Sequence, residues 1–184
     1  MSLVVPTHDP GGKVRPAWPA DSTVTAVFSA CQQYRYQLRE VWDISKPLVL
    51  WVLMNPSVAC TDYSDPTLRK TGKFARAWGF GGQLVGNVHA YRATDKSNLL
   101  NVADPVGPGN DHAILEMAAQ AKTVVLAYGQ PPKALRKRGR AVEALLSNHP
   151  ELCHLRLAQD GTPVHPLYLP ETLRPIAHKG RTNA

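Results

Sequence analysis

Pro47-Leu-Val-Leu-Trp-Val-Leu-Met-Asn-Pro-Ser57 is the segment around which the predicted fold is built. Its residues 48–54 are all apolar, which is too few to span a bilayer but fits a strand buried on both faces of a helix-covered parallel sheet. Proline at position 56 biases Asn55 toward an extended backbone, so we expect the chain to leave the sheet there and turn. In open α/β sheets, ligands bind just past the carboxyl end of a central strand. We therefore expect Asn55, Pro56 and Ser57 to form the floor of a site.

The length and charge of the chain describe one basic domain. The 184 residues are enough to bury roughly 70% of the surface that the unfolded chain would expose. Lys and Arg outnumber Asp and Glu by 21 to 14, which gives a net charge of +7. Such a balance favours polyanionic partners such as nucleic acid, nucleotides or acidic lipid, although a soluble protein with a basic face explains it equally well.

Cysteine usage and the N-terminal residues indicate a cytoplasmic protein. The three cysteines, Cys31, Cys60 and Cys153, are odd in number and show no C-x-x-C spacing, so neither a disulfide framework nor a zinc site is expected. The chain does not begin with a charged start followed by an apolar core, so no signal peptide and no membrane association are predicted. A Rossmann G-x-G-x-x-G and a Walker loop are absent, and we expect no cofactor and no metal.

Alternating elements predict the fold class. Residues 1–22 are rich in proline and read as a flexible N-terminal arm, residues 23–176 as a single α/β domain and residues 177–184 as a polar tail. A β-hairpin is predicted from residues 23–28 and 34–42. Further strands are predicted at 83–88, 123–128 and 153–157, and helices at 66–78, 110–120 and 131–147. This order predicts a mostly parallel central sheet with helices on both faces.

Local patterns make finer predictions. Ser64 or Asp65 is expected to cap the first helix, with Pro66 in its first turn, and Asn110 or Asp111 to cap the second. The second helix is expected to bury Ile114, Leu115, Met117 and Ala118. Alternation in the second hairpin strand predicts one face with Tyr34, Tyr36 and Leu38 and an opposite, exposed row with Arg35, Gln37 and Arg39. That row could contact phosphates or be a solvated strand face.

Polar residues follow several of the predicted strands. Right-handed crossovers return each parallel strand in the same direction, so these residues should gather at one edge of the sheet. They are Asn55, Asn87, Gly129 and His165. Two asparagines and a histidine suit a planar heteroaromatic ligand, because an amide donates and accepts along a base edge while histidine donates to a carbonyl oxygen. Each asparagine could equally be a turn former.

Other residues could take part in chemistry. Asp62 or Asp65 could orient or deprotonate a water, although Asp65 could simply cap the helix. Arg69 could pair with Asp65 or hold a phosphate, and Phe74 could stack on a ligand or lie in the core. A basic run could be a solvated helix face or could contact phosphates: Lys133, Arg136, Lys137, Arg138 and Arg140.

Six short motifs occur in order along residues 24–175. They read Tyr34-Arg35-Tyr36-x-Leu38, Met54-Asn55-Pro56-Ser57, Asp65-Pro66-Thr67-x-Arg69, Asn87-x-x-Ala90-x-Arg92-Ala93-Thr94, Asp104-Pro105-x-Gly107-Pro108 and His165-Pro166-Leu167-Tyr168. Together they resemble domain-of-unknown-function family sixteen-forty-three. That family would have a basic residue where Glu40 stands and a proline where Lys96 stands. Ser57 and Arg92, which lie in these motifs, join the candidate substrate-binding residues.

A weaker likeness is to the uracil-DNA glycosylase superfamily. The shared order is strand, Asn-Pro loop, helix, strand ending in Asn, strand ending in Gly and a late His-Pro segment. The likeness implies a glycosylase-like fold, with Asn55 and Asp62 or Asp65 at a water, Phe74 as a stacking ring, Asn87 on the base and His165 at the leaving group. Breaking a glycosidic bond builds positive charge on the sugar and negative charge on the base, so carboxylates and hydrogen-bond donors must lie on opposite sides of it.

Three functions stay open at this stage. The first is recognition of a nucleobase or nucleotide by a hydrolase of N-glycosidic bonds that resembles DNA glycosylases. The second is a non-catalytic module that binds nucleic acid or nucleotides, and the third is an enzyme acting on a small phosphorylated metabolite. Nucleic acid or a nucleotide is the expected partner.

Overall fold

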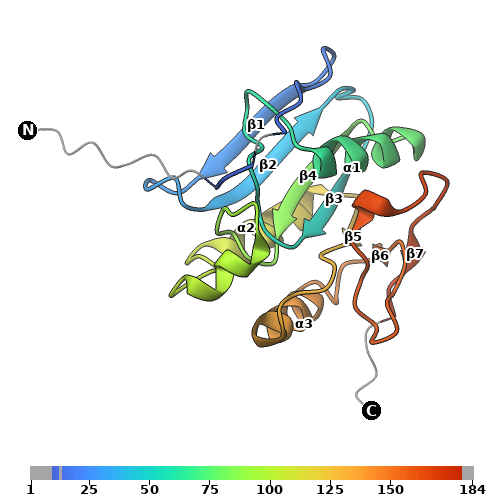
Figure 1. Cartoon of the computed structure of the whole chain (residues 1–184). Helices are drawn as coiled ribbons and strands as arrows, with labels where there is room; N and C mark the ends of the chain where they lie inside the picture. The colour runs from blue at the N-terminus through green and yellow to red at the C-terminus, as the bar shows by residue number, and fades with distance from the viewer. Residues whose placement is uncertain (1–9, 13, 180–184) are drawn as a thin grey trace, which may run out of the picture.

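The computed structural model describes residues 10–12 and 14–179, which fold around one sheet (Figure 1). The strands are β1 Thr23–Phe28, β2 Arg35–Val41, β3 Leu48–Leu53, β4 Gly82–Asn87, β5 Thr123–Leu126, β6 Leu152–His154 and β7 Ile176–Ala177. The α-helices are α1 Pro66–Ala77, α2 Asn110–Gln120 and α3 Arg136–Leu145. Three short 3₁₀ helices are η1 Lys96–Asn101, η2 Lys133–Leu135 and η3 Pro166–Tyr168.

The sheet of the described residues has seven strands in the order β1-β2-β4-β3-β5-β6-β7. The predicted α/β class and the predicted hairpin of β1 and β2 are confirmed. The prediction of a mostly parallel sheet is wrong, because only the pairings β3–β4, β3–β5 and β5–β6 are parallel. The hairpin adds antiparallel strands at one edge and β7 adds one at the other, which makes the sheet mixed. The chain crosses from one side of β3 to the other between β4 and β5, which creates a topological switch point there.

The central strand β3 is buried on both faces, as its apolar run predicts. Leu50 and Val52 pack in an apolar cluster with residues of α2 and α3. Val49 and Trp51 point the other way, into a cluster with residues of α1. Helices therefore cover both faces of the sheet, with α1 on one and α2 and α3 on the other (Figure 1).

A β-bulge in the hairpin changes which side chains of β2 are buried. Val27 pairs with Gln37 and Phe28 pairs with Arg35, so Tyr36 is an extra residue in β2. A bulge of this kind reverses the alternation of side chains on the bulged strand. Arg35 consequently turns into the protein and is only 2% exposed, which overturns its prediction as part of an exposed row.

The remaining side chains of β2 follow from the same bulge. Gln37 and Arg39 donate hydrogen bonds to side chains of α2, at 2.8 and 3.3 Å. Tyr36 lies on that side too, against Gly109 at the start of α2, whereas Leu38 is buried in the cluster on the α1 side. Tyr36 and Leu38 therefore do not share a face, contrary to the prediction.

The starts of the helices were predicted with mixed success. Asp65 caps α1 and its carboxylate accepts the Leu68 N–H at 2.9 Å, as expected. Neither predicted residue caps α2, because Gly109 occupies the cap position and no side chain bonds there. Asn110 instead donates from its buried amide to the Asn87 carbonyl at 2.9 Å. This contact fixes which face of α2 is buried. That face holds Ala113, Ile114, Met117 and Ala118, and it leaves Leu115 exposed rather than buried.

Part of the predicted N-terminal arm is bound to the domain. Thr94 donates its N–H to the Pro10 carbonyl at 2.8 Å, and Ser64 donates its N–H to the Pro16 carbonyl at 2.8 Å. The Trp18 indole donates to the Cys60 carbonyl at 3.0 Å. Residues 1–9 and 13 of the predicted arm lie outside the described residues, as do 180–184 of the predicted tail. The first residue of that predicted tail, at position 177, is the last residue of β7.

Candidate functional site

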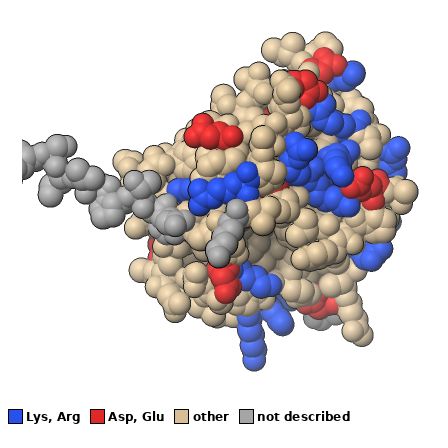
Figure 2. Space-filling model, turned by 45° about the horizontal axis from the view of Figure 1, so that its top comes forward, with Lys and Arg blue, Asp and Glu red and all other residues tan. Residues whose placement is uncertain are grey.

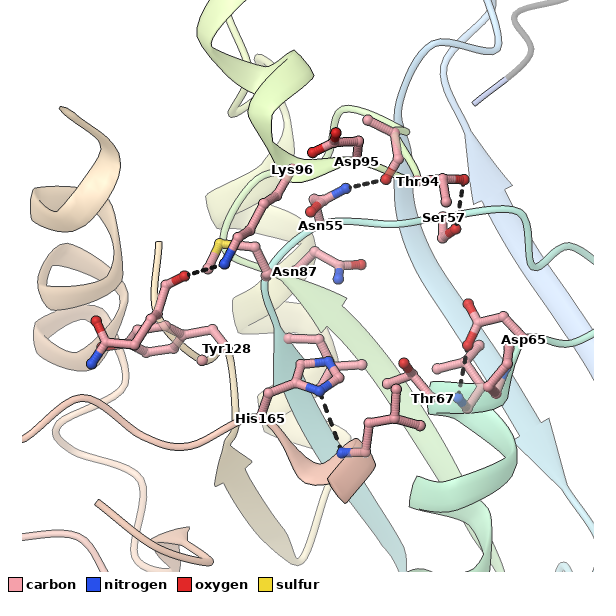
Figure 3. Close-up of a pocket in the computed structure, with 18 of the residues that line it drawn as sticks. Asn55, Ser57, Asp65, Thr67, Asn87, Thr94, Asp95, Lys96, Tyr128 and His165 are labelled. Atoms are coloured by element: carbon pink, nitrogen blue, oxygen red, sulfur yellow. Dashed lines mark hydrogen bonds between the residues drawn. The ribbon is translucent and has the colours of Figure 1, made fainter. Parts of the chain in front are cut away.

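A cavity of about 620 Å³ lies at the carboxyl ends of β3, β4 and β5 (Figure 3). Its wall is completed by the start of α1, by the loop before η1 and by the residue before η3. Small-molecule sites typically occupy 300–1,000 Å³, and in open α/β sheets they lie at a topological switch point. Both the size and the position of this cavity therefore fit a ligand site.

The structure brings together five of the predicted site residues. Asn55, Ser57, Asp65, Asn87 and His165 all line this cavity. They come from four separate segments, the loop after β3, the start of α1, the end of β4 and the residue before η3. Gathering of strand-end residues at one edge is what the predicted winding of the sheet requires.

Four other predicted residues do not line the cavity. Asp62 is exposed, and its carboxylate accepts a hydrogen bond from the neighbouring Thr61 hydroxyl at 3.4 Å. Arg69 lies on the exposed side of α1 and donates to the Ala17 carbonyl at 3.2 Å. Neither side chain is placed to contact a ligand in this cavity.

The side chains of Phe74 and Arg92 make contacts in other parts of the protein. Phe74 is fully buried between the rings of Trp51 and Trp78, whose centroids lie 6.0 and 5.4 Å away. It is a core residue and not a stacking surface for a ligand. The Arg92 guanidinium donates to the Gln32 carbonyl at 2.8 Å and lies over the Phe28 ring, on the side of the hairpin.

Arg35 is a cavity residue that the sequence did not reveal. Its guanidinium donates to the Ala59 carbonyl at 3.0 Å and to Asn87 Oδ1 at 3.3 Å. Burial lowers the pKa of Arg35 to about 10, against the opposing effect of the Asp65 carboxylate, so the group is still a cation at neutral pH. The bulge at Tyr36 turns this side chain inward, and no periodic pattern in the sequence indicates that bulge.

A hydrogen bond from Arg35 orients the side-chain amide of Asn87. Its Oδ1 accepts from Arg35, whereas its buried Nδ2 has no hydrogen-bond partner among the described residues. Asn87 is 1% exposed and lines the cavity. Figure 3 shows its amide between Asn55 and His165. A buried donor without a partner costs about 1–3 kcal/mol, which a ligand with a matching acceptor would recover.

His165 is a neutral donor at the cavity. Its Nδ1 accepts the Leu167 N–H at 3.3 Å, so the ring proton resides on Nε2. Burial, helped by the charge of Lys96, lowers the pKa of His165 to about 4, and the ring is uncharged at pH 7. Figure 3 shows the second ring nitrogen turned toward Asn87.

Asp65 has two roles at once. It caps α1 and lines the cavity, with 7% of its surface exposed. Burial raises the pKa of this carboxyl, while the Leu68 N–H and the charge of Arg35 act in the opposite direction. The sequence left open whether Asp65 caps the helix or takes part in a site. The structure shows that Asp65 can do both.

Asn55 and Ser57 connect the floor of the cavity to the loop before η1. The Asn55 amide nitrogen donates to the Ala93 carbonyl at 2.6 Å and to the Pro56 carbonyl at 3.1 Å (Figure 3). Ser57 and Thr94 share a hydrogen bond between their hydroxyls at 3.0 Å. Asn55 is thus a turn residue, and its Oδ1 is the part that can accept a bond from a ligand or a water.

The wall at the end of β5 was predicted only as a glycine turn. Gly129 has φ of +68°, and a Cβ there would lie 2.9 Å from the His165 Cβ, so this close approach requires glycine. Lys96, another cavity residue, donates from Nζ to the Gln130 carbonyl at 2.7 Å. The hydroxyl of Tyr128 donates to Glu143 of α3, which fixes its ring at the wall.

The described residues contain no group of three or more His, Cys, Asp or Glu side chains placed to hold a metal ion. Their longest helix, α1, has 12 residues, and none of their helices has the length and apolar character needed to cross a membrane.

Comparison with known proteins places the chain in a family. The model of a family described as "Protein of unknown function (DUF1643)" matches residues 35–167, which are 133 of the 184 residues. The chain belongs to this family. The matched range includes these polar residues of the cavity: Arg35, Asn55, Asp65, Asn87 and His165. No curated protein and no solved structure gives a significant match. The DUF1643 description assigns no activity, so function has to be argued from the cavity.

Proposed function

We propose that the cavity binds a nucleobase through its carbonyl oxygens and that the protein hydrolyses the N-glycosidic bond of that base, in the manner of a DNA glycosylase. The order of elements on which the likeness to the uracil-DNA glycosylase superfamily rests supports the proposal, from the Asn-Pro loop to the late His-Pro segment. The cavity at the switch point supports it as well.

The observation that carries the proposal is the buried Nδ2 of Asn87. Arg35 bonds to Oδ1, and the amide N–H donors of Asn87 are left without a partner among the described residues. His165 adds a third donor, its neutral Nε2–H. Donors match the carbonyl oxygens of bases such as uracil and hypoxanthine. They repel the amino groups of cytosine and adenine at the corresponding positions.

The remaining cavity groups fit the chemistry of hydrolysis. A water attacks the sugar carbon while the bond from that carbon to the base breaks, and the bonding electrons leave with the base. Asp65 accepts the proton of the water and its negative charge stabilises the positive sugar, a task suited to a carboxyl with a raised pKa. Asn55 Oδ1 orients the water, and the His165 Nε2–H and Asn87 stabilise the departing base.

Thermal unfolding in the presence of free bases tests recognition. A ligand that binds only the folded state raises the melting temperature in proportion to its affinity and concentration. Uracil and hypoxanthine are expected to raise it, and cytosine and adenine to leave it unchanged. If no base stabilises the protein, or if stabilisation comes only from phosphorylated sugars without a base, the proposal fails.

Oligonucleotides that carry uracil or hypoxanthine test catalysis. The wild-type protein is expected to release the base and leave alkali-labile abasic sites. The Asp65→Asn variant keeps a good helix cap and should bind the free base but release none from the oligonucleotide. Base binding by the wild type without any release would identify a binding module and overturn the catalytic part of the proposal.

A further inference from the structure

The segment that follows the β5 wall of the cavity carries an exposed cationic face. Lys133 in η2 and Arg136, Lys137 and Arg140 in α3 are separated by three, one and three residues, the spacing that places side chains on one face of a helix. All four are exposed, and no carboxylate of the described residues pairs with any of them. Arg138, which lies among them in sequence, points inward and donates to the Val88 carbonyl at 2.7 Å.

The first helix also carries four cations, but three of them pair with carboxylates, and the fourth, Arg69, donates to the Ala17 carbonyl. Lys70 and Lys73 pair with Glu171 at 3.1 and 3.4 Å, and Arg76 pairs with Asp21 at 2.8 Å. Neither helix has an acidic residue in its first turn, but no carboxylate of the described residues pairs with the four cations of the α3 face. Cations near a helix N-terminus add to the positive end of the helix dipole instead of offsetting it. The positive field outside α3 therefore stays available to a partner.

The cationic face is fixed next to the cavity. Gln130 lines the cavity, and only two prolines separate it from Lys133. A Cβ on Gly139 of α3 would lie 2.7 Å from the ring of Tyr128, so α3 packs directly on a cavity residue. Arg138 ties α3 to the main chain one residue after Asn87. Figure 2 shows Lys and Arg side chains on both sides of the hollow in this face of the molecule.

We propose that Lys133, Arg136, Lys137 and Arg140 bind the phosphodiester backbone of a nucleic-acid strand and so direct its bases to the cavity. This inference rests on the proposed function and names its polymeric substrate. The face extends over eight residues, or roughly 10 Å along the helix axis, which matches about four phosphates of one strand. Contacts of this kind position the strand without reading its sequence.

The test measures binding of short single-stranded DNA without modified bases over a range of salt concentrations. One variant replaces the four cations of the proposed face by glutamine: Lys133→Gln, Arg136→Gln, Lys137→Gln and Arg140→Gln. The matched control removes four cations that each pair with a carboxylate: Lys46→Gln, Lys70→Gln, Lys73→Gln and Arg76→Gln. Both variants have the same net charge, so a difference between them reports the location of the charge and not its amount.

The α3 variant is expected to lose affinity and to lower the slope of log Kd against log salt by about 3, at about 0.7 per phosphate contact on a single strand. The control should keep most of the wild-type slope. Equal behaviour of the two variants, or polyglutamate competing as well as DNA, would overturn the proposal. Replacing the DNA by RNA of the same sequence shows which polymer is preferred.

Stabilisation by free uracil separates this inference from the proposed function. Both variants should bind the free base as the wild type does, because none of the eight substituted residues lines the cavity. If the free base does not bind and only the α3 variant loses affinity for DNA, the cationic face is supported as a phosphate-binding surface and the proposed function fails. If the base binds but the four substitutions in the cationic face leave the affinity for DNA unchanged, only the role of that face is refuted.

Discussion

Two sides of the cavity are built in different ways. On the Arg35 side, which comprises Arg35, Asp65 and Asn87, the polar groups are buried and bonded to one another or to the main chain. On the His165 side, which comprises Gly129 and His165, the ring is held by one hydrogen bond of 3.3 Å and by a close backbone approach. The Arg35 side is a network of buried polar groups that bond to one another. The His165 side is a single ring held by few contacts.

The difference determines what a substitution can reveal. The hydrogen bonds that orient Asn87 on the Arg35 side also satisfy buried groups of the fold, so a change there alters stability and ligand binding together. On the His165 side the ligand-facing Nε2 is not part of the bonding that maintains the fold. Replacing the His165 ring should therefore separate the two effects, whereas a change at Gly129 alters both. The predictions that follow are ordered by the size of the stability difference expected.

The largest loss of stability is expected for Arg35→Met. The substitution leaves the Ala59 carbonyl and Asn87 Oδ1 without their donor and the buried Asp65 without its cation. Breaking a buried charge network from one side costs about 3–5 kcal/mol, measured as the free energy of unfolding in denaturant. Arg39→Met, on the same strand but bonded only to Gln120, should stay within about 0.5 kcal/mol of the wild type. If both variants lost a similar free energy of unfolding, Arg35 would not be the centre of a stabilising polar network.

Acid should destabilise the protein through His165. Its pKa is lowered from 6.5 in the unfolded chain to about 4 in the fold, so the unfolded state binds more protons between these values. Stability is therefore complete above pH 6.5 and declines as the pH falls to 4, by about 3 kcal/mol for this group.

The variant His165→Asn isolates that contribution. Denaturation at a series of pH values should show a smaller acid loss in the variant than in the wild type. The pKa of His89, also lowered to about 4 by burial, acts in both proteins and cancels in the comparison. Parallel curves for the two proteins would show that His165 is not the titrating group.

Gly129→Ala should combine a moderate loss of stability with a loss of base binding. An alanine at positive φ costs about 1–2 kcal/mol, and its Cβ would push against His165. Gly79→Ala is the matched control, because Gly79 also has positive φ but a Cβ there meets nothing within 4 Å. Gly129→Ala should lose at least as much stability in denaturant as Gly79→Ala, and only Gly129→Ala should lose the thermal shift with uracil. Retained binding in Gly129→Ala would mean that the ring position is not critical.

The smallest difference in stability is expected between Asp65→Asn and Asp65→Ala. Both leave the buried Arg35 without its carboxylate, but asparagine is as good a helix cap as aspartate and alanine is not. Asp65→Ala removes the cap and should cost about 1 kcal/mol more. Base release should be lost in both variants. If Asp65→Asn kept release, the carboxylate would not be the group that accepts the proton.

The sequence predicted the parts of the fold that depend on periodic patterns. The apolar run of β3 and the Asp-Pro start of α1 predicted the central strand and the first helix, and the winding rule predicted that Asn55 and Asn87 meet at one cavity. His165 reaches the same cavity from the segment before η3. These features follow from local chemistry or from a rule that holds for nearly all parallel sheets.

The failures arise where the outcome depends on pairing between distant segments. The bulge that buries Arg35 is a mismatch between two strands and cannot be read in either one. Phe74 lies in the core because Trp51 of the distant strand β3 packs against it and against Trp78 at the end of its own helix. Lys96 reaches the cavity wall through a bond to Gln130, a contact set by loop geometry. The two-residue strand β7 is too short to leave a periodic signal.

The residues before β1 have a consequence for how the family is delimited. Pro10 accepts a hydrogen bond from Thr94, which lines the cavity, and Pro16 accepts one from Ser64, which precedes the cavity residue Asp65. Both prolines precede the DUF1643 match, which begins at residue 35. A polypeptide trimmed to the matched residues would lose these two braces together with the first strand of the sheet. The range of the family match is therefore narrower than the folded domain.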